Sequence, residues 1–184
     1  MTELYFIRHA KPDYSVHEDA LRPLTALGEA QAQILADRLS HIRFDAVYSS
    51  PYLRCVRTVQ PLADAQKLEI VTHDGLRERK VDSLWIEDFQ TFTQRQWADF
   101  QYKLTDGECL AEVQQRNLAA LEEILAAEAG KTIAIGTHGT AFSVILNHYN
   151  PEFSYEAFQR IAPITPYVYH MAFDGHVLIS EAEV

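Results

Sequence analysis

Short apolar runs alternate with longer amphipathic segments along most of the chain, and this alternation predicts an α/β protein. The runs that predict strands cover residues 4–7, 44–48, 68–71 and 132–136. Segments with helical spacing of their apolar residues cover 26–42, the stretch after Pro51, 108–127 and 140–148. Strands and helices that alternate in this way are typical of a parallel sheet covered on both faces.

Boundary signals support the helix predicted over 26–42. Thr25 precedes it as a candidate N-cap, and Glu29 lies in the first turn, where a negative charge favours the helix dipole. The expected apolar stripe of this helix consists of Leu27, Ile34, Leu35, Leu39 and Ile42. In the helix after Pro51, Pro61 is expected to cause a kink or an early end.

The C-terminal part of the chain predicts a hairpin. Residues 167–173 and 176–179 read as two strands around an Asp174-Gly175 turn. Such a hairpin adds an antiparallel edge to a mostly parallel sheet, so the predicted fold is three-layer α/β/α, in a single domain over residues 1–184. The segment 84–105 is rich in aromatic residues, which are expected to pack in the interior or to line a substrate entrance.

Composition narrows the class of protein. With 47% hydrophobic residues the 184-residue chain is too apolar for disorder, and a net charge of −10 disfavours nucleic acid as a partner. No apolar stretch approaches the roughly 18 residues of a membrane helix, so no membrane partner is expected. The start lacks the pattern of a secretory signal, and Cys55 and Cys109 lack disulfide-framework or zinc-site spacing. We therefore expect a cytoplasmic protein.

Basic and polar residues gather where three of the predicted strands end. Arg8 and His9 follow the first strand, Arg54 follows the second, and His138 and Gly139 follow the fourth. In open α/β sheets the ligand crevice lies beyond the carboxyl ends of the strands, so these residues are expected to meet there. Arg8 and His9 would face opposite ways within a regular strand, so the chain is expected to leave extended geometry near them.

The residue types in these clusters suit the transfer of a phosphoryl group. A neutral imidazole can attack phosphorus near pH 7 when its other nitrogen is held as a donor, which makes His9 a candidate nucleophile. Guanidinium groups match phosphate oxygens, so Arg8 and Arg54 are candidate phosphate ligands. His138 and Gly139 open a predicted helix, and could add an imidazole donor and the positive end of that helix.

Four ordered motifs make the chain resemble the histidine phosphatase superfamily, also called the phosphoglycerate mutase-like fold, over nearly its whole length. Residues 8–10, 24–32, 50–58 and 137–139 are similar to the family's RHG, LTxxGxxQA, SPLxRAxxT and SHG motifs. The resemblance implies that His9 is the phosphorylated nucleophile. It also implies that Arg8, Arg54 and His138 complete the phosphate pocket. Glu78 stands where the family's LxE motif has its proton donor.

The assignment of Glu78 depends on its neighbours. A general acid must be protonated before it reacts, and Arg77 and Arg79 favour the ionised carboxylate unless their side chains point away. Two departures from the family pattern concern the loops: residues 11–17 lack the asparagine of mutase-like members, and residues 81–84 lack the usual glycines. Substrate recognition is therefore expected to differ from that of sugar-phosphate mutases.

Several other polar residues lie near the motifs in the sequence. Gly139 and Arg22 are included as candidate substrate ligands, whereas Arg57 is expected mainly to pair on the helix surface. Ala10 replaces the usual glycine of RHG, which would restrict any positive φ there. His9, Asp13 and His17 superficially suggest a metal site, but their four-residue spacing aligns only on a helix, which Pro12 opposes.

The predicted function is metal-independent and cofactor-independent phosphomonoester hydrolysis through a phosphohistidine at His9. The substrate is a small phosphorylated metabolite or a phosphoprotein, and the sequence selects neither. The alternatives are a phosphoglycerate-type mutase, which usually has longer insertions and a C-terminal tail, a non-catalytic module that binds phosphate or a phosphoprotein, and a metallohydrolase. The oligomeric state is not predicted.

Overall fold

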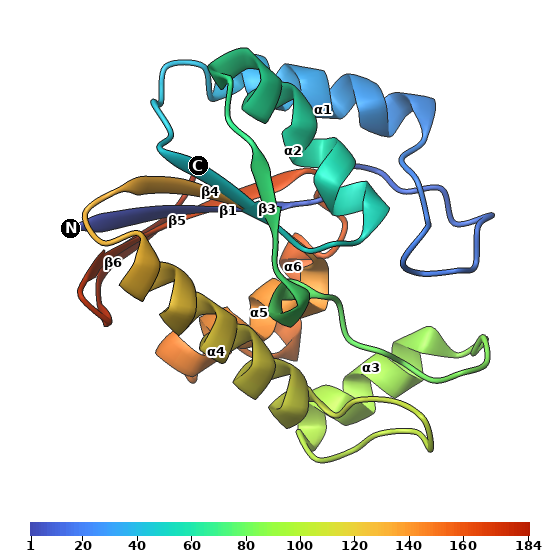
Figure 1. The fold of residues 1–184 in the computed structure, drawn as a ribbon. Coiled ribbons are helices and arrows are strands. Elements are labelled where there is room, and N and C mark those ends of the chain that lie inside the picture. Colours follow the sequence, from blue (N-terminus) through green and yellow to red (C-terminus); the bar gives the residue numbers. More distant parts are fainter.

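A six-stranded sheet runs through the molecule, with helices on both of its faces (Figure 1). The computed structural model describes all 184 residues. The strands are β1 (Thr2–Arg8), β2 (Ala46–Ser49), β3 (Ile70–Thr72), β4 (Thr132–Thr137), β5 (Tyr167–Asp174) and β6 (Val177–Glu183). The helices are α1 (Ala26–Arg38), α2 (Leu53–Gln66), α3 (Phe89–Ala98), α4 (Leu110–Ala127), α5 (Gly139–Tyr149) and α6 (Tyr155–Ile161), and a 3₁₀ turn, η1, covers Asp74–Leu76.

The sheet topology confirms the predicted fold class. The strand order is β3-β2-β4-β1-β5-β6, in which β1 to β4 are parallel and the C-terminal pair is antiparallel. The β5–β6 hairpin turns at Gly175, whose φ of 58° lies in the left-handed region that glycine adopts without strain. The predicted parallel sheet with an antiparallel edge is therefore correct.

Alternation along β1 divides the interior into two cores. Leu4 and Phe6 face α4 and α5, where the rings of Phe6 and Phe142 stack with centroids 5.0 Å apart. Ile7 faces the other way, into a core formed with α1 and α2. Burying a side chain such as Phe6 contributes about 1.5–3 kcal/mol, so both layers hold the sheet between them. The central strands β1 and β4 are thereby fixed by packing on two sides.

The buried face of α1 differs from the predicted stripe. Thr25 caps the helix as expected, its hydroxyl accepting from Gly28 N at 3.0 Å. Leu27 and Ile34, however, are 54% and 65% exposed. The buried positions within the helix are Gly28, Ala32, Leu35 and Ala36. A Cβ at Gly28 would lie 2.3 Å from Lys11 O, so a small residue is needed there. This close approach of the backbone determines which face of α1 is buried.

Two other helix predictions need correction, and one helix was missed. Helix α1 ends at Arg38 rather than at residue 42. Helix α2 continues through Pro61 to Gln66, so the expected early end is wrong. The seven-residue helix α6 was not predicted, because it is too short to show a clear apolar period. Within the aromatic segment 84–105, only Phe89–Ala98 is helical.

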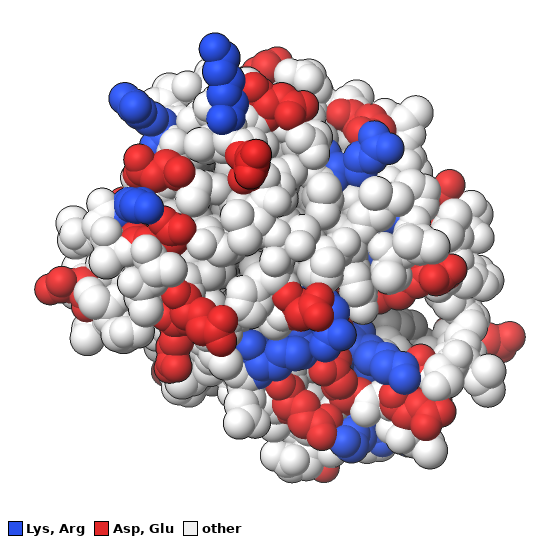
Figure 2. Space-filling model, in the orientation of Figure 1, with Lys and Arg blue, Asp and Glu red and all other residues white.

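Charged side chains on the face shown in Figure 2 are mixed in sign rather than segregated. The cations that gather below the middle of this view lie beside acidic groups. Arg116, for example, pairs with Glu108 at 2.9 Å. None of the helices combines the length and the apolar character that crossing a membrane would require.

Candidate active site

Three of the parallel strands deliver polar residues to one edge of the sheet. The backbone N–H of His9 donates to Thr137 O at 3.0 Å, just beyond β1 and β4, and Ser50 N donates to Gly136 O at 2.9 Å beyond β2. Strand β1 ends at Arg8, so His9 is free of the strict alternation that would turn it away from its neighbour. The end of β1 at Arg8 is consistent with the prediction that the chain leaves extended geometry near these two residues.

His9 is held in one orientation by backbone contacts. Its side chain is buried, and Nδ1 lies 2.8 Å from Ala10 O, an atom that can only accept, so Nδ1 carries the ring proton. Nε2 is therefore left with its lone pair. Ala10 N donates to Thr58 Oγ1 at 2.9 Å, which anchors this turn to α2. Ala10 is fully buried without positive φ, which explains why alanine is accommodated there.

Burial and nearby guanidinium groups keep His9 neutral. Desolvation is the largest cause of its low pKa, which lies well below the ordinary value for histidine. The positive charge of Arg54 lowers the pKa further, and Arg8 and Arg22 act in the same direction. An imidazole in this setting has an unprotonated Nε2 near neutral pH.

Arg8 is anchored at one of its terminal nitrogens only. Nη1 donates to the carbonyl oxygens of Ile161, Ala162 and Ile164 at 3.1, 2.6 and 3.1 Å, at the end of α6 and just beyond it. Nε is buried and has no hydrogen-bond partner. A Cβ on Gly139 would lie 3.2 Å from this Nε, so the glycine leaves space for the guanidinium to lie against the start of α5. This N–H can therefore donate to an anion that lies between Arg8 and the start of α5.

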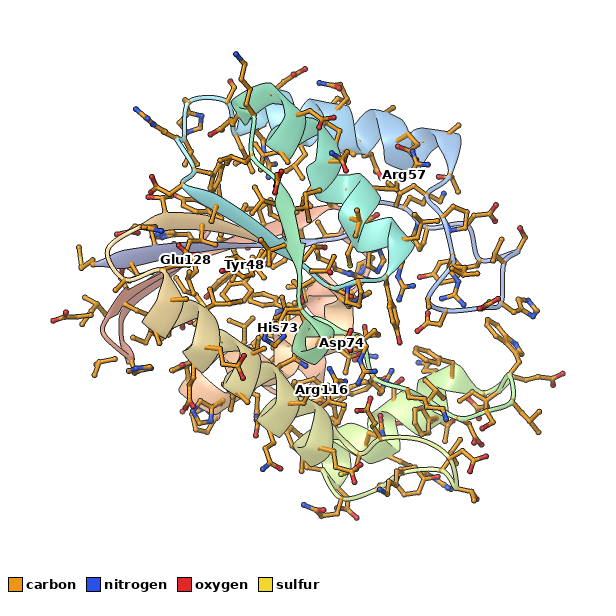
Figure 3. All side chains as sticks on the ribbon, in the orientation of Figure 1. Tyr48, Arg57, His73, Asp74, Arg116 and Glu128 are labelled. Carbon is orange, nitrogen blue, oxygen red and sulfur yellow. The ribbon has the colours of Figure 1, made fainter.

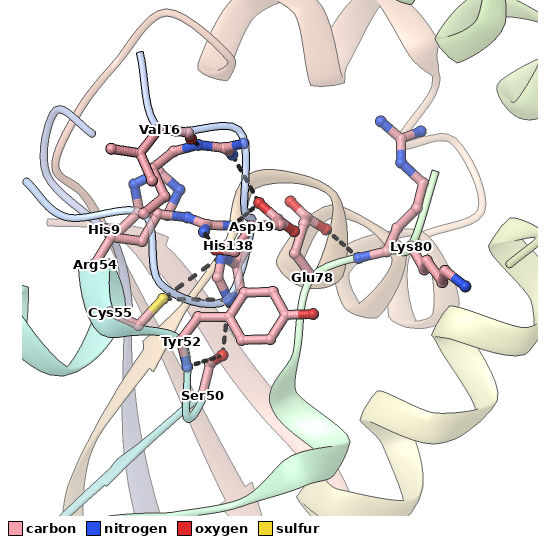
Figure 4. Close-up of polar contacts among 12 residues, drawn as sticks. His9, Val16, Asp19, Ser50, Tyr52, Arg54, Cys55, Glu78, Lys80 and His138 are labelled. Carbon is pink, nitrogen blue, oxygen red and sulfur yellow. Dashed lines mark hydrogen bonds and ion pairs between the residues drawn. The ribbon is translucent and has the colours of Figure 1, made fainter. Parts of the chain in front are cut away.

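Arg54 is covered by Asp19. Nη1 of Arg54 donates to the backbone oxygen of Asp19 at 2.5 Å, and Nη2 lies 3.0 Å from Asp19 Oδ1. Arg22 Nη1 reaches the same Oδ1 at 2.7 Å, while its Nε and Nη2 donate to Val16 O and His17 O. Arg22 thus holds its own loop together. Figure 4 shows the Asp19 carboxylate among these groups, on the side of the site that faces Glu78.

His138 forms the floor of the cluster. It is completely buried, with its ring centroid 5.4 Å from that of His9 and Nε2 2.8 Å from Ser50 Oγ. Burial, Arg54 and His9 together hold its pKa well below the usual histidine value. Cys55 Sγ lies 3.3 Å from the same Nε2, and burial raises the pKa of this thiol, so the thiol stays protonated and unreactive.

Glu78 binds the N-terminus of α5, which begins directly after His138. Its Oε2 accepts from Thr140 N and its Oε1 from Ala141 N, each at 3.0 Å, and Oε1 also accepts from Arg79 N at 2.8 Å. A carboxylate is favoured at this end of a helix by the unpaired N–H groups and the dipole. The contacts fix the carboxyl group relative to His138 because both lie at the same helix start.

The segment that carries Glu78 is braced from α4. Arg116 Nη1 donates to Gly75 O at 2.8 Å and to Arg77 O at 2.9 Å, and its guanidinium also pairs with Glu108 (Figure 3). Arg79 points away from the site: its Nη1 reaches Gln96 Oε1 at 2.5 Å, and burial lowers its pKa to about 10. The arginine that follows Glu78 therefore serves the packing of α3.

The structure separates the remaining sequence candidates. Arg57 is exposed and lines a polar groove between α1 and α2 with Glu29 and Asp64, away from the cluster (Figure 3). Asp13 accepts from Ser15, and the ring of His17 stacks on Trp85 with centroids 4.4 Å apart, so neither lies with His9 as in a metal site. No group of three or more His, Cys, Asp or Glu side chains is placed to hold a metal ion.

Sequence reasoning missed Asp19, and it treated the aromatic segment as one unit. No motif marks Asp19, because its loop has no helical or strand period. Aromatic side chains from 84–105 divide between two environments: Phe92 is buried, whereas Trp85 and Phe89 are 60% and 49% exposed. The prediction of interior packing therefore holds for part of the segment, and the use of the exposed pair at a substrate entrance stays a prediction.

Comparison with known proteins shows the family of this chain. Residues 4–178 match the family model described as histidine phosphatase superfamily (branch 1). Phosphoserine phosphatase 1 of Hydrogenobacter thermophilus is 30% identical over 155 residues, which cover 75% of this chain and 71% of that protein. A Yersinia enterocolitica protein named probable phosphoglycerate mutase is 28% identical over 159 residues, with coverage of 80% and 74%.

A solved structure extends the agreement to the fold. A mutant phosphoserine phosphatase from Entamoeba histolytica, in complex with phosphoserine, superposes with a TM-score of 0.78 at 21% identity, covering 98% of this chain and 96% of that one. The match of the family model over nearly the whole sequence supports phosphatase chemistry. The chain belongs to the histidine phosphatase superfamily.

Proposed function

We propose that this protein hydrolyses small phosphomonoesters through a phosphohistidine at His9, without a metal ion or cofactor. The observation that carries the proposal is the state of the His9 ring. Its Nδ1 is fixed on Ala10 O, its Nε2 is unprotonated, and Arg8 has a buried N–H without a partner close by. A neutral nucleophile beside unpaired guanidinium donors is what attack on an anionic phosphoryl group requires.

In the first step, His9 Nε2 forms a bond to phosphorus while the bond from phosphorus to the leaving oxygen breaks. Arg8, Arg54 and His138 bind the phosphoryl group, and Gly139 leaves room for Arg8 against the helix start. The leaving oxygen needs a proton, which Glu78 supplies. Its Oε1 already accepts two N–H groups, whereas Oε2 accepts one and retains a lone pair that can carry this proton.

In the second step, water attacks phosphorus, the bond to Nε2 of His9 breaks, and Glu78 takes the proton that the water loses. Inorganic phosphate leaves, and His9 returns to its neutral state. The oxygen atom of water ends in the phosphate, and no oxidant, reductant or further reactant is needed. Each of the three guanidinium nitrogens of Arg22 donates to a residue of its own loop. Arg22 therefore affects the site by holding this loop in place and through its positive charge.

Two kinds of relative leave one alternative to be tested. One is named as a phosphatase and another as a probable mutase, so identity alone does not choose between water and a second substrate as the acceptor of the phosphoryl group. We favour hydrolysis because loops 11–17 and 81–84 depart from the mutase pattern. The substrate is proposed to be a small metabolite, such as an amino acid or sugar phosphate, and the buried free thiols of Cys55 and Cys109 suit a cytoplasmic setting.

The test is to trap the intermediate. Wild-type protein is mixed with p-nitrophenyl phosphate, quenched in alkaline denaturant, and digested for mass spectrometry. We expect a phosphoryl group on the peptide containing His9, a burst of p-nitrophenol, and loss of both in His9→Asn.

Unchanged turnover in His9→Asn would refute the mechanism, and tight phosphate binding with an unmodified His9 would favour a binding module. Isomerisation of phosphoglycerate faster than phosphate release would identify a mutase, and abolition of activity by EDTA would identify a metallohydrolase.

A further inference from the structure

One of the side chains assigned to the phosphate, Arg54, is already paired with an anion of the protein itself. Asp19 Oδ1 accepts from both Arg54 and Arg22, and the backbone oxygen of Asp19 accepts from Arg54. Ala20 O also accepts from Leu53 N at 3.0 Å, which ties this stretch of loop to the start of α2. Both terminal nitrogens of Arg54 are therefore engaged by one residue.

This contact lies among buried polar side chains. The exposed fractions of His9, Arg54 and His138 are 5%, 3% and 0%, so little of their surface is open to solvent while Asp19 is paired with Arg54. Asp19 itself is 39% exposed at its side chain and lies at the boundary with solvent. Arg54 is fixed because it belongs to the packed helix α2. Asp19 belongs to a loop, so a movement of that loop would separate Asp19 from Arg54.

Charge gives the reason why the two anions exclude each other. A phosphomonoester has nearly two negative charges at neutral pH, and it would share the guanidinium of Arg54 with a carboxylate that already binds there. Repulsion between the phosphate of the substrate and the Asp19 carboxylate is strongest where burial limits screening by water.

We propose that Asp19 is an internal competitor for the phosphate site: its carboxylate occupies Arg54 in the free protein and is displaced by the phosphoryl group of the substrate. This inference rests on the proposed function, because it takes Arg54 to be a phosphate ligand. Displacement frees Arg54 for the substrate and releases the Asp19 end of the loop. Return of the carboxylate after hydrolysis helps to expel inorganic phosphate, which is the product that would otherwise stay bound.

The loop also carries a reporter of this movement. His17 lies two residues from Asp19 and stacks on Trp85 at an interplanar angle of 13°. When Asp19 leaves Arg54, the stack is disturbed and the fluorescence of Trp85 changes. Trp97, the other tryptophan of the chain, packs against Phe158 with centroids 5.6 Å apart and lies away from the loop.

The experiment measures competitive inhibition by inorganic phosphate and by vanadate. Asp19→Asn keeps the shape of the side chain but removes its charge, and we expect it to lower both inhibition constants about fivefold. Asp13→Asn is the matched control, because Asp13 lies on the same loop, contacts Ser15 rather than an arginine, and should leave the constants unchanged. Phosphate should change tryptophan fluorescence in wild-type protein but not in Trp85→Phe.

The outcomes separate this inference from the function beneath it. If wild-type protein forms the phosphohistidine and turns over, but Asp19→Asn shows unchanged or higher inhibition constants, Asp19 is not a competitor and the inference is wrong. If Asp13→Asn lowers the inhibition constants as much as Asp19→Asn does, the effect comes from the net charge of the protein, and the inference about Asp19 is also wrong. If wild-type protein neither forms the phosphohistidine nor responds to phosphate, the proposed function fails, and this inference fails with it.

Discussion

The cluster at the strand ends, formed by Arg8, His9, Arg54, Glu78 and His138, differs from the two loops beside it in the contacts that hold it. In the cluster, His9, His138 and Glu78 are positioned by hydrogen bonds to the backbone or to Ser50, next to the ends of packed strands and the start of α5. The mouth loops, residues 11–23 and 80–88, meet through side chains, by the stack of His17 on Trp85. Backbone contacts in a core cannot be changed without unfolding, whereas side-chain contacts at the surface exchange readily.

This difference assigns separate tasks to the two regions. Chemistry needs groups held to within a fraction of an ångström, which the sheet edge and the start of α5 provide. Admission of substrate needs contacts that break, and the ion pairs of Asp19 are of this kind. Variants in the cluster should therefore reduce turnover strongly, and variants in the mouth loops should change affinity or selectivity more than the rate of the chemical step.

The largest effect is expected for the arginines of the cluster. Arg54→Ala and Arg8→Ala should each lower kcat by roughly a hundredfold to a thousandfold, because each removes donors to the transferred phosphoryl group. Arg57→Ala is the control: it lies one turn along the same helix, is exposed, and should change kcat less than about twofold. Equal effects of Arg54→Ala and Arg57→Ala in steady-state assays would remove Arg54 from the phosphate pocket.

Glu78→Gln should produce an effect that depends on the leaving group. With an alkyl phosphate, whose leaving oxygen needs a proton, we expect a loss of about a hundredfold in kcat/KM. With p-nitrophenyl phosphate the loss should be much smaller, because p-nitrophenolate leaves without protonation. The ratio of the two losses is the quantity to measure. A uniform loss for both substrates would indicate that Glu78 only stabilises the start of α5.

A smaller effect concerns stability against pH. The pKa values of His9 and His138 are lowered in the folded protein, mainly by burial, whereas unfolded histidines titrate near pH 6.5. Below that pH the unfolded chain takes up protons that the folded protein does not, so the free energy of unfolding falls as pH falls. We expect these two groups to lower it by about 2 kcal/mol between pH 7.5 and 5.5.

Urea denaturation at both pH values checks this prediction. His9→Asn should lose about half of the decrease that the two histidines cause, since carboxylates contribute equally to both proteins. An identical pH dependence of wild-type protein and His9→Asn would mean that the ring of His9 is protonated as easily in the folded protein as in the unfolded chain, and would weaken its assignment as a neutral nucleophile.

The smallest effect on turnover is expected in the mouth loops. Trp85→Ala should change kcat for p-nitrophenyl phosphate less than about threefold. The reason is that Trp85 is 60% exposed and makes no hydrogen bond to a residue of the cluster. Selectivity should change more: the ratio of kcat/KM for naphthyl phosphate over glycerol phosphate should fall when the exposed indole is removed. A larger loss in kcat than in this ratio would place Trp85 with the cluster.

The sequence alone predicts most elements of the fold and the residues that meet in the cluster. Periodicity identified the four parallel strands, the hairpin and most helices, because burial of one face leaves a regular pattern. Arg8, His9 and His138 were recognised from residue types at strand ends, where parallel strands must converge. The turn after His9 and the N-terminus of α5 are short-range features, so neighbouring residues are enough to specify them.

Tertiary structure decided what depends on distant segments. The buried face of α1 follows from the approach of Lys11 O to Gly28, and the direction of Arg79 follows from Gln96 on α3. Asp19 reaches Arg54 across 35 residues of sequence, in a loop without a period that could reveal it. A local pattern records which face of an element is apolar, but it does not record which charged side chain from elsewhere will fill a polar pocket.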